Sequence, residues 1–164
     1  MCRCGAIRTD KERNTLYDGP STCRAAVMVG GVIDCKYGCV GLGDCVKVCP
    51  TGALALSDEK ISVDMQKCIG CGNCVKACPR ILFQFVPPQE HIYSVACNNI
   101  EGGGYVKTVC KKGCIACGIC AQVSDSPFFM KGNLSYIDYG KAKLKPQEEA
   151  KGKCPTKCIV KINA

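Results

Sequence analysis

The first half of the chain carries short β-prone runs separated by polar residues. The runs GALAL at 52–56 and ISVD at 61–64 flank a polar stretch at 57–60. Two runs of this length around a polar turn are typical of a β-hairpin. A further apolar run, ILFQF at 81–85, predicts another strand, which the prolines that follow would end.

The second half repeats this order. FFM at 128–130 and LSYID at 134–138 flank polar residues 131–133, and CIVKI at 158–162 closes this half as ILFQF closes the first. Such a repeat predicts two structural units of the same kind. Between them, the glycines at 102–104 indicate a flexible link, since the strand and helix that a phosphate-binding loop needs are not evident around them.

Cysteine dominates the composition. The 164 residues include 18 Cys, one His, four Phe and no Trp, so the apolar inventory is small and we expect metals or disulfides to add stability. Most cysteines fall in Cys-x2-Cys and Cys-x3-Cys-Pro groups, which favour metal-bound thiolates in a reducing cytoplasm. No stretch resembles a signal peptide or a membrane-spanning run, so we expect no direct membrane insertion.

The run from Cys68 to Pro79 predicts cluster binding. It matches the Cys-x2-Cys-x2-Cys-x3-Cys-Pro pattern of bacterial two-cluster ferredoxins, in which three thiolates bind one [4Fe–4S] cluster and the fourth binds its neighbour. Under this crossing rule the first three cysteines take a fourth partner from the preceding run. The predicted set is Cys68, Cys71, Cys74 and Cys49.

The companion cluster departs from the pattern. Cys78 would cross over to it, but Leu42 stands where the middle cysteine of its own run belongs. Cys35 is the nearest substitute upstream. The predicted set of the companion is therefore Cys35, Cys39, Cys45 and Cys78.

The second unit keeps only one of its two ligand sets. Aligned on the first unit, Ser124 and Asp125 stand where Cys-Pro belongs, and Ala142 stands where Cys68 does. By the crossing rule the surviving cysteines form one complete set. They are Cys114, Cys117, Cys120 and Cys154, which brings the expected total to three [4Fe–4S] clusters.

Six cysteines remain outside these sets: Cys2, Cys4, Cys23, Cys97, Cys110 and Cys158. One interpretation is that they are buried or free thiols. The other is a fourth cluster held by Cys4, Cys23, Cys97 and Cys110, because the segment between the units has no other need for thiols. Zinc is the alternative metal throughout, although three closely spaced thiolates with Cys-Pro suit a cube better than one tetrahedral ion.

The predicted fold class is α+β, with tandem bacterial-ferredoxin-like units whose small cores are centred on clusters. We expect a cysteine-containing leader at 1–34 and a two-cluster unit at 35–90. A cysteine-containing connector at 91–109 and a degenerate one-cluster unit at 110–164 follow. We interpret the lone His91 as a surface histidine and expect no catalytic site.

The formal charge of +8 is a weak indication of a nucleic-acid partner. Each cluster with four thiolates adds about −2, so three clusters leave roughly +2. Neither a helix-turn-helix nor a basic helix is apparent, and we expect no nucleic acid. One local lysine run is either a solvated surface or a docking patch for an acidic redox partner; it comprises Lys141, Lys143, Lys145, Lys151 and Lys153.

Beyond the general ferredoxin motif, several stretches are more particular. NTLYDGPSTCRAA at 14–26, DCKYGCVGLGDCVKVCPTGAL at 34–54 and GCIACGIC at 113–120 resemble the B subunit of Rnf-type complexes, which are membrane ferredoxin:NAD oxidoreductases. The likeness runs along residues 3–159. Members of that family usually begin with a membrane helix and a further cluster motif, and they usually keep all eight cysteines of the second unit.

The resemblance implies an iron–sulfur subunit that relays low-potential electrons within a larger oxidoreductase complex. It implies partner subunits, with flavin- or NAD-binding ones among the candidates, and soluble ferredoxin as donor or acceptor. The expected location is the cytoplasm, with membrane association through partner subunits. A free-standing polyferredoxin and an iron–sulfur redox or iron sensor are the alternatives.

Overall fold

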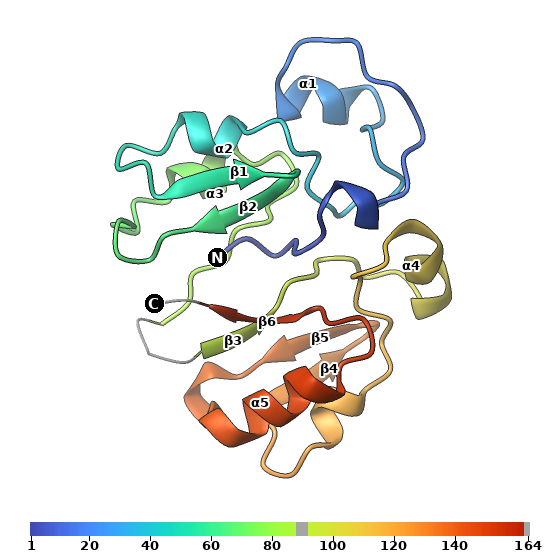
Figure 1. Ribbon diagram of the computed structural model, residues 1–164, viewed down its shortest axis with the longest axis vertical. Coiled ribbons are helices and arrows are strands. Elements are labelled where there is room, and N and C mark those ends of the chain that lie inside the picture. The colour runs from blue at the N-terminus through green and yellow to red at the C-terminus, as the bar shows by residue number, and fades with distance from the viewer. Residues whose placement is uncertain (88–91, 163–164) are drawn as a thin grey trace.

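The computed structural model describes residues 1–87 and 92–162, so His91 and the expected domain limit at residue 90 lie outside the described residues. The fold has two halves, one above the other in Figure 1. The upper half contains α1 (Cys23–Met28), α2 (Asp44–Lys47), β1 (Leu54–Ser57), β2 (Lys60–Val63) and α3 (Asn73–Ala77). The lower half contains β3 (Ile92–Val95), α4 (Gly103–Val109), β4 (Phe128–Lys131), β5 (Leu134–Ile137), α5 (Leu144–Lys153) and β6 (Ile159–Ile162).

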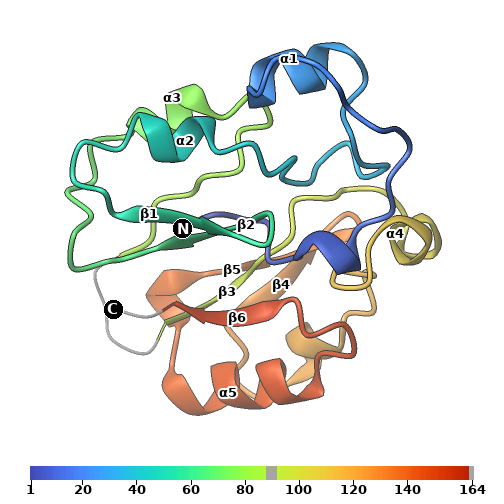
Figure 2. The same cartoon turned by 45° about the horizontal axis from the view of Figure 1, so that its top comes forward.

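Single 3-10 turns complete the elements, and they are Arg8–Asp10, Ile119–Gln122 and Tyr139–Lys141. Figure 2 shows α2 and α3 on one side of the molecule and α5 on the other, with the strands between them. This mixture of short helices and small sheets is the expected α+β class. None of the helices in the described part of the chain is long and apolar enough to cross a bilayer.

Both expected hairpins form. β1 pairs antiparallel with β2, and β4 pairs antiparallel with β5. In the first hairpin the two turn residues, Asp58 and Glu59, have φ values of 49° and 59°, as a tight hairpin turn requires. Gly132 takes a φ of 59° in the second turn. The polar residues between the apolar runs therefore set both turns.

The closing strands differ between the halves. β6 pairs antiparallel with β3, whereas the run at 81–85 forms only an isolated bridge between Phe83 and Cys2. The leader nevertheless takes the position in the upper half that β3 takes in the lower half. In the upper half the Arg3 N–H donates to the Leu82 carbonyl at 2.7 Å. The equivalent bond in the lower half runs from the Ala96 N–H to the Cys158 carbonyl at 2.8 Å. The Gln84 N–H also donates to the Met1 carbonyl at 3.0 Å, so the leader pairs with residues 82–84 through a few backbone hydrogen bonds.

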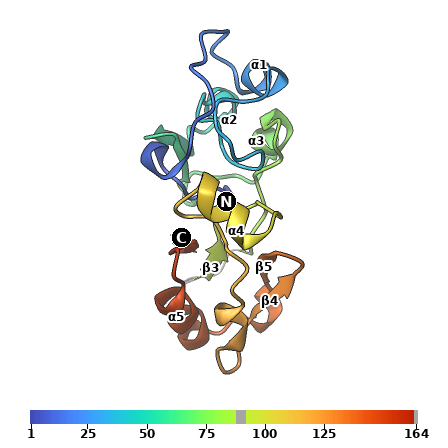
Figure 3. The same cartoon turned by 90° about the vertical axis from the view of Figure 1, so that its right-hand side faces the viewer.

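The leader also forms the seam between the halves. Gly5 donates its N–H to the Ala96 carbonyl at 2.9 Å, and Lys111 donates to the Asp10 carbonyl at 2.8 Å. Glu12 donates to the Val109 carbonyl at 3.1 Å. Figure 3 shows the N-terminal end of the chain at mid-height of the molecule, between the two halves. The leader is thus held by both halves through backbone hydrogen bonds.

The segment expected to be a flexible connector is ordered instead. It contributes β3 to the lower sheet, and α4 begins at Gly103. A side chain at Gly103 would collide with the backbone carbonyl of Ile115, whereas nothing lies within 4 Å of the corresponding position at Gly104. The glycine run therefore allows a close approach between α4 and the loop that begins at Cys114.

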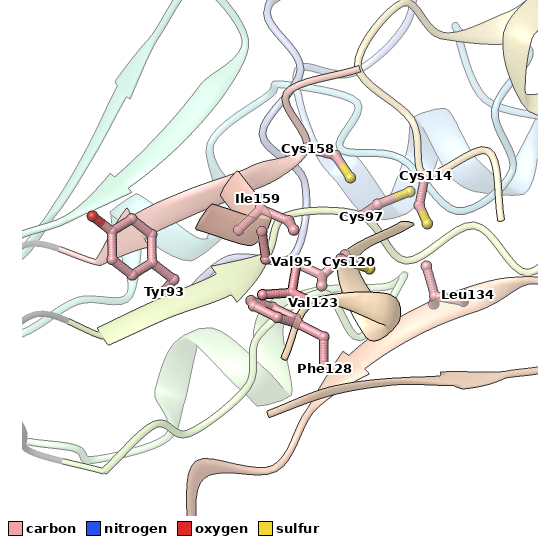
Figure 4. Packing of buried hydrophobic residues seen from close by; sticks show 11 residues of the cluster. Tyr93, Val95, Cys97, Cys114, Cys120, Val123, Phe128, Leu134, Cys158 and Ile159 are labelled. Atoms are coloured by element: carbon pink, nitrogen blue, oxygen red, sulfur yellow. The ribbon is translucent and has the colours of Figure 1, made fainter. Parts of the chain in front are cut away.

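The buried core is divided into three small clusters, and cysteines belong to each. The lower cluster combines Val95, Phe128 and Leu134 with four buried cysteines, most of which Figure 4 displays. Cores of this size bury little apolar surface. A group bound by the cysteine thiols of these clusters would therefore add to the stability of the fold.

Candidate cluster sites

The cysteine side chains gather around four hollows. Site A is lined by Cys23, Cys39, Cys45 and Cys78. Site B is lined by Cys49, Cys68, Cys71 and Cys74. Site C is lined by Cys114, Cys117, Cys120 and Cys154. Site D is lined by Cys4, Cys35, Cys97 and Cys110.

Each hollow has at least the four thiols that a [4Fe–4S] cluster needs. A fifth thiol lines two of them, Cys2 at site A and Cys158 at site C. All the cysteines are free of disulfides. Among residues 1–87 and 92–162, no three Cys, His, Asp or Glu side chains converge on a point where they could hold a single metal ion.

Site B has the composition that the crossing rule predicts, with Cys49 from the first run beside Cys68, Cys71 and Cys74. The loop that carries the latter three turns through Gly70 and Gly72, at φ values of 68° and 76°. Burial acts to raise the pKa of Cys49, but hydrogen bonds from the hydroxyl and N–H of Thr51 outweigh it, so this pKa is lowered. Cys49 is therefore favoured as the thiolate that a metal needs.

Site A differs from the expected set at one position. Cys39, Cys45 and Cys78 line it as predicted, Cys35 does not, and the two further thiols there are Cys2 and Cys23. We assign Cys23 to the position expected for Cys35. Cys23 is the first residue of α1, and its N–H donates to the Asp44 carboxylate on α2 at 2.9 Å. This hydrogen bond holds the start of α1 against the cluster loop.

Site C has the expected four cysteines and a fifth thiol, Cys158. The Cys158 sulfur lies 3.7 Å from that of Cys154. A hydrogen bond from Cys158 lowers the pKa of Cys114 to about 6 and that of Cys154 to about 5, while the pKa of Cys158 itself is raised. Cys158 thus remains a protonated donor, and its two neighbours are favoured as thiolates.

Site D differs from the expected fourth set by one residue, because Cys35 lines it in place of Cys23. Burial raises the pKa of Cys35, and it raises those of Cys97 and Cys110 to about 12 and 11. Negative charge on Cys4 raises each of the three further. All four thiols line the same hollow.

Two cations lie beside these sites, Lys11 buried and Arg80 partly buried. The Lys11 ammonium group donates to the carbonyls of Cys39 at 3.0 Å and Glu59 at 2.9 Å, and its side chain is 1% exposed. The Arg80 guanidinium donates to the carbonyls of Cys35 and Gly38, both at 2.7 Å. Positive charge in these places offsets the negative charge of thiolate-bound clusters.

A repeated sequence pattern indicated that Cys35 belongs to site D and not to site A. CKYGC at 35–39 and CKKGC at 110–114 are the same pattern in the two halves. Cys35 is thus the counterpart of Cys110, and Leu42 that of Cys117. The repeat therefore groups Cys35 with Cys110. Because Leu42 replaces a ligand of site A, that site needs a thiol from elsewhere in the chain.

The lysine run near the C-terminal end is largely paired with acidic neighbours. Three of its ammonium groups lie within 4.0 Å of a carboxylate oxygen. The distances are 3.8 Å for Lys141 and Asp138, 4.0 Å for Lys143 and Asp125, and 2.6 Å for Lys153 and Glu149. All these side chains are well exposed. Exposed pairs of this kind contribute little to stability, and they favour the interpretation of a solvated surface.

Comparisons with known proteins agree with this geometry. Two models of a 4Fe-4S dicluster domain match residues 31–79 and 67–124. Together with the four thiol-lined hollows, these matches define an iron–sulfur protein with tandem ferredoxin-like domains. The chain therefore binds [4Fe–4S] clusters.

The chain is also similar to larger proteins. It is 37% identical over 163 residues to the B subunit of the proton-translocating ferredoxin:NAD(+) oxidoreductase complex of Clostridium ljungdahlii, covering 98% of this chain and 57% of the relative. Identity to the B subunit of the Na(+)-translocating complex of Acetobacterium woodii is 36%, over 94% of this chain and 46% of the relative.

A third relative is the B subunit of an ion-translocating oxidoreductase complex of Methanosarcina acetivorans, at 40% identity over 66% of this chain and 42% of the relative. The chain is thus a relative of the B subunits of these complexes, as the resemblance indicated. It spans about half the length of the curated relatives it matches.

Proposed function

We propose that this chain is an electron-relay subunit of an oxidoreductase complex, with [4Fe–4S] clusters held at sites A, B and C. The observation that carries the proposal is the grouping of cysteines far apart in sequence around common hollows. Each bound cluster supplies a one-electron redox couple. The ligand sets follow the geometry, so Cys23 joins Cys39, Cys45 and Cys78.

Exposure divides the sites into outer and inner ones. Cys68 and Cys71 at site B are exposed, and so is Cys117 at site C. At site A, by contrast, Cys23, Cys39 and Cys45 are buried. Electron exchange with a partner needs a short approach to the bound group, so sites B and C are the expected points of entry and exit.

The neighbouring side chains would control water and charge. Ile69 and Phe85 line site B but are 68% and 67% exposed, which offers an apolar rim to a docking protein. Backbone N–H groups and the Thr51 hydroxyl donate to Cys49. Such hydrogen bonds to cluster sulfurs make reduction easier by stabilising the added negative charge.

The names of the relatives suggest the partners. Each is a subunit of an oxidoreductase complex, and two act in ferredoxin:NAD(+) complexes. We propose that this chain also works beside other subunits, with a flavin- or NAD-binding subunit on one side and soluble ferredoxin as donor or acceptor. Membrane association would then come through those subunits.

The test is anaerobic reduction of the cluster-loaded chain by reduced ferredoxin, followed by EPR spin integration. We expect signals of reduced [4Fe–4S] clusters, with at least about three electrons taken up per chain. In the variant Cys71→Ala about four iron atoms should be lost while the signal of site C persists. Bound zinc in place of iron, or clusters that ferredoxin cannot reduce, would contradict the proposal.

A further inference from the structure

We propose that site D, formed by Cys4, Cys35, Cys97 and Cys110, binds a fourth [4Fe–4S] cluster at the seam between the two halves. This goes beyond the relay proposed above, which needs only sites A, B and C. The four thiols come from segments that are widely separated in sequence, and the fold brings them around one hollow.

Each half contributes an equivalent pair of cysteines to site D. Cys35 and Cys110 begin the repeated CKYGC and CKKGC patterns. Cys4 and Cys97 each follow a residue whose N–H donates to the closing run of its own half, Arg3 to Leu82 and Ala96 to Cys158. A site built from two equivalent pairs is a feature of the repeated fold, which chance burial of four thiols would not produce.

The hollow at site D is similar in size to those of sites A and C. Its atom-free space, open solvent included, is about 380 Å³, against about 390 Å³ at site A, 340 Å³ at site C and 1040 Å³ at the more open site B. Cys4, Cys35 and Cys97 are buried, and Cys110 is partly buried. A hollow of this size with the same four donors suits the same group.

Hydrogen-bond donors and cations surround the thiols of site D. The buried Asn99 side chain donates its N–H to the Cys35 sulfur at 3.4 Å, a contact typical of cluster ligands. Arg3, Lys11 and Lys112 also line the hollow. Such positive charge suits a cluster that carries about −2 with its four thiolates.

Arg80 links site D to site A. It lines the hollow of site A, and its Nη1 donates to the carbonyls of Cys35, a thiol of site D, and Gly38, which lines both hollows. Its Nε is buried without a hydrogen-bond partner among the described residues, which is costly for a guanidinium N–H, and a sulfur acceptor at site A would supply that partner.

Site D also lies between the other sites. Gly38 lines both site A and site D, and one short loop joins Cys110 of site D to Cys114 of site C. In Figure 4 the side chains of Cys97 and Cys114 lie next to each other. A cluster at site D would thus connect the two-cluster half with the one-cluster half.

The first test is metal analysis of the anaerobically loaded wild-type chain. We expect about 16 iron and 16 sulfide per chain, no zinc, and Mössbauer spectra of [4Fe–4S] clusters only. About 12 iron would overturn the fourth cluster and leave the relay intact. Fewer than about eight would contradict both proposals, and stoichiometric zinc with about 12 iron would show that site D is a zinc site.

The second test uses variants checked for folding by circular dichroism. Cys97→Ala and Cys110→Ala should each lose about four iron atoms and keep the EPR signal of site C. Val109→Ala is the matched control, because Val109 is buried next to Cys110 but does not line any of the four hollows, and it should lose none. Full iron retention in both site D variants would overturn the proposal.

Discussion

The guanidinium of Arg80 donates a 2.7 Å hydrogen bond to the backbone carbonyl of Cys35. Arg80 follows directly on Cys78 and Pro79, so this contact joins the end of one cysteine run to the loop that separates sites A and D. A partly buried cation beside two bound clusters would favour the addition of an electron to either.

Arg80→Gln should therefore make the clusters beside it harder to reduce. We expect the midpoint potential of the affected signals to fall by roughly 50 mV, from loss of about 1 kcal/mol of charge stabilisation. Potentiometric titration followed by EPR measures the shift. Lys76→Gln is the control, since Lys76 is exposed on α3, and an equal shift in that variant would refute a local effect of Arg80.

Cys23 and Leu42 provide a test of the ligand exchange at site A. Cys23→Ala should lose about four iron atoms, because site A would keep only three of its four proposed ligands. Adding Leu42→Cys to this variant places a cysteine where the second half has Cys117, and it should restore the iron. Iron and sulfide assays compare the two variants, and an unchanged iron content in Cys23→Ala would rule out Cys23 as a ligand.

Cys158 is expected to tune site C without binding iron. The variant Cys158→Ala should keep its iron, but it removes the hydrogen bond to Cys114 and Cys154. Without that donor, reduction at site C becomes less favourable and the potential falls by some tens of mV. EPR-monitored titration measures the shift, with Cys154→Ala, which should lose the cluster, as reference. Iron loss in Cys158→Ala would mean that it is a ligand.

The glycines that begin α4 should respond in opposite ways to the same substitution. Gly103→Ala places a methyl group against the Ile115 carbonyl, and we expect about 1–3 kcal/mol of destabilisation with damage to site C. Gly104→Ala meets open space and should be neutral or stabilising by up to about 1 kcal/mol. Thermal unfolding compares the two, and equal melting temperatures would contradict the close approach.

Local signals in the sequence predicted the local parts of this structure. The hairpins depend on polar turns between neighbouring apolar runs, and the set of Cys49 with Cys68 depends on a motif of fixed spacing. The run at 81–85 was expected to be a strand, but it forms only a bridge between Phe83 and Cys2. No local signal indicated this pairing, because the leader is far away in sequence. The glycine run was misinterpreted as flexible, since the carbonyl of Ile115 that it accommodates is visible only in three dimensions.

The exchange of Cys23 and Cys35 has the same origin. Proximity in sequence favoured Cys35 as the partner of Cys39. In the fold, however, Cys35 lines a hollow together with Cys4 and Cys110. A thiol that fills a missing position can come from any segment, and spacing alone does not identify it. The repeated pattern at 35–39 and 110–114 was the available clue.

The position of the leader between the halves affects how the protein is made. Cys4 leaves the ribosome long before Cys97 and Cys110 have been synthesised, and yet all three line one hollow. Domains fold in the order of synthesis, so site B can be completed early, whereas site D is complete only when most of the chain exists. During that interval Cys4 must be kept reduced. The newly made chain is therefore sensitive to oxygen before a cluster can form at site D.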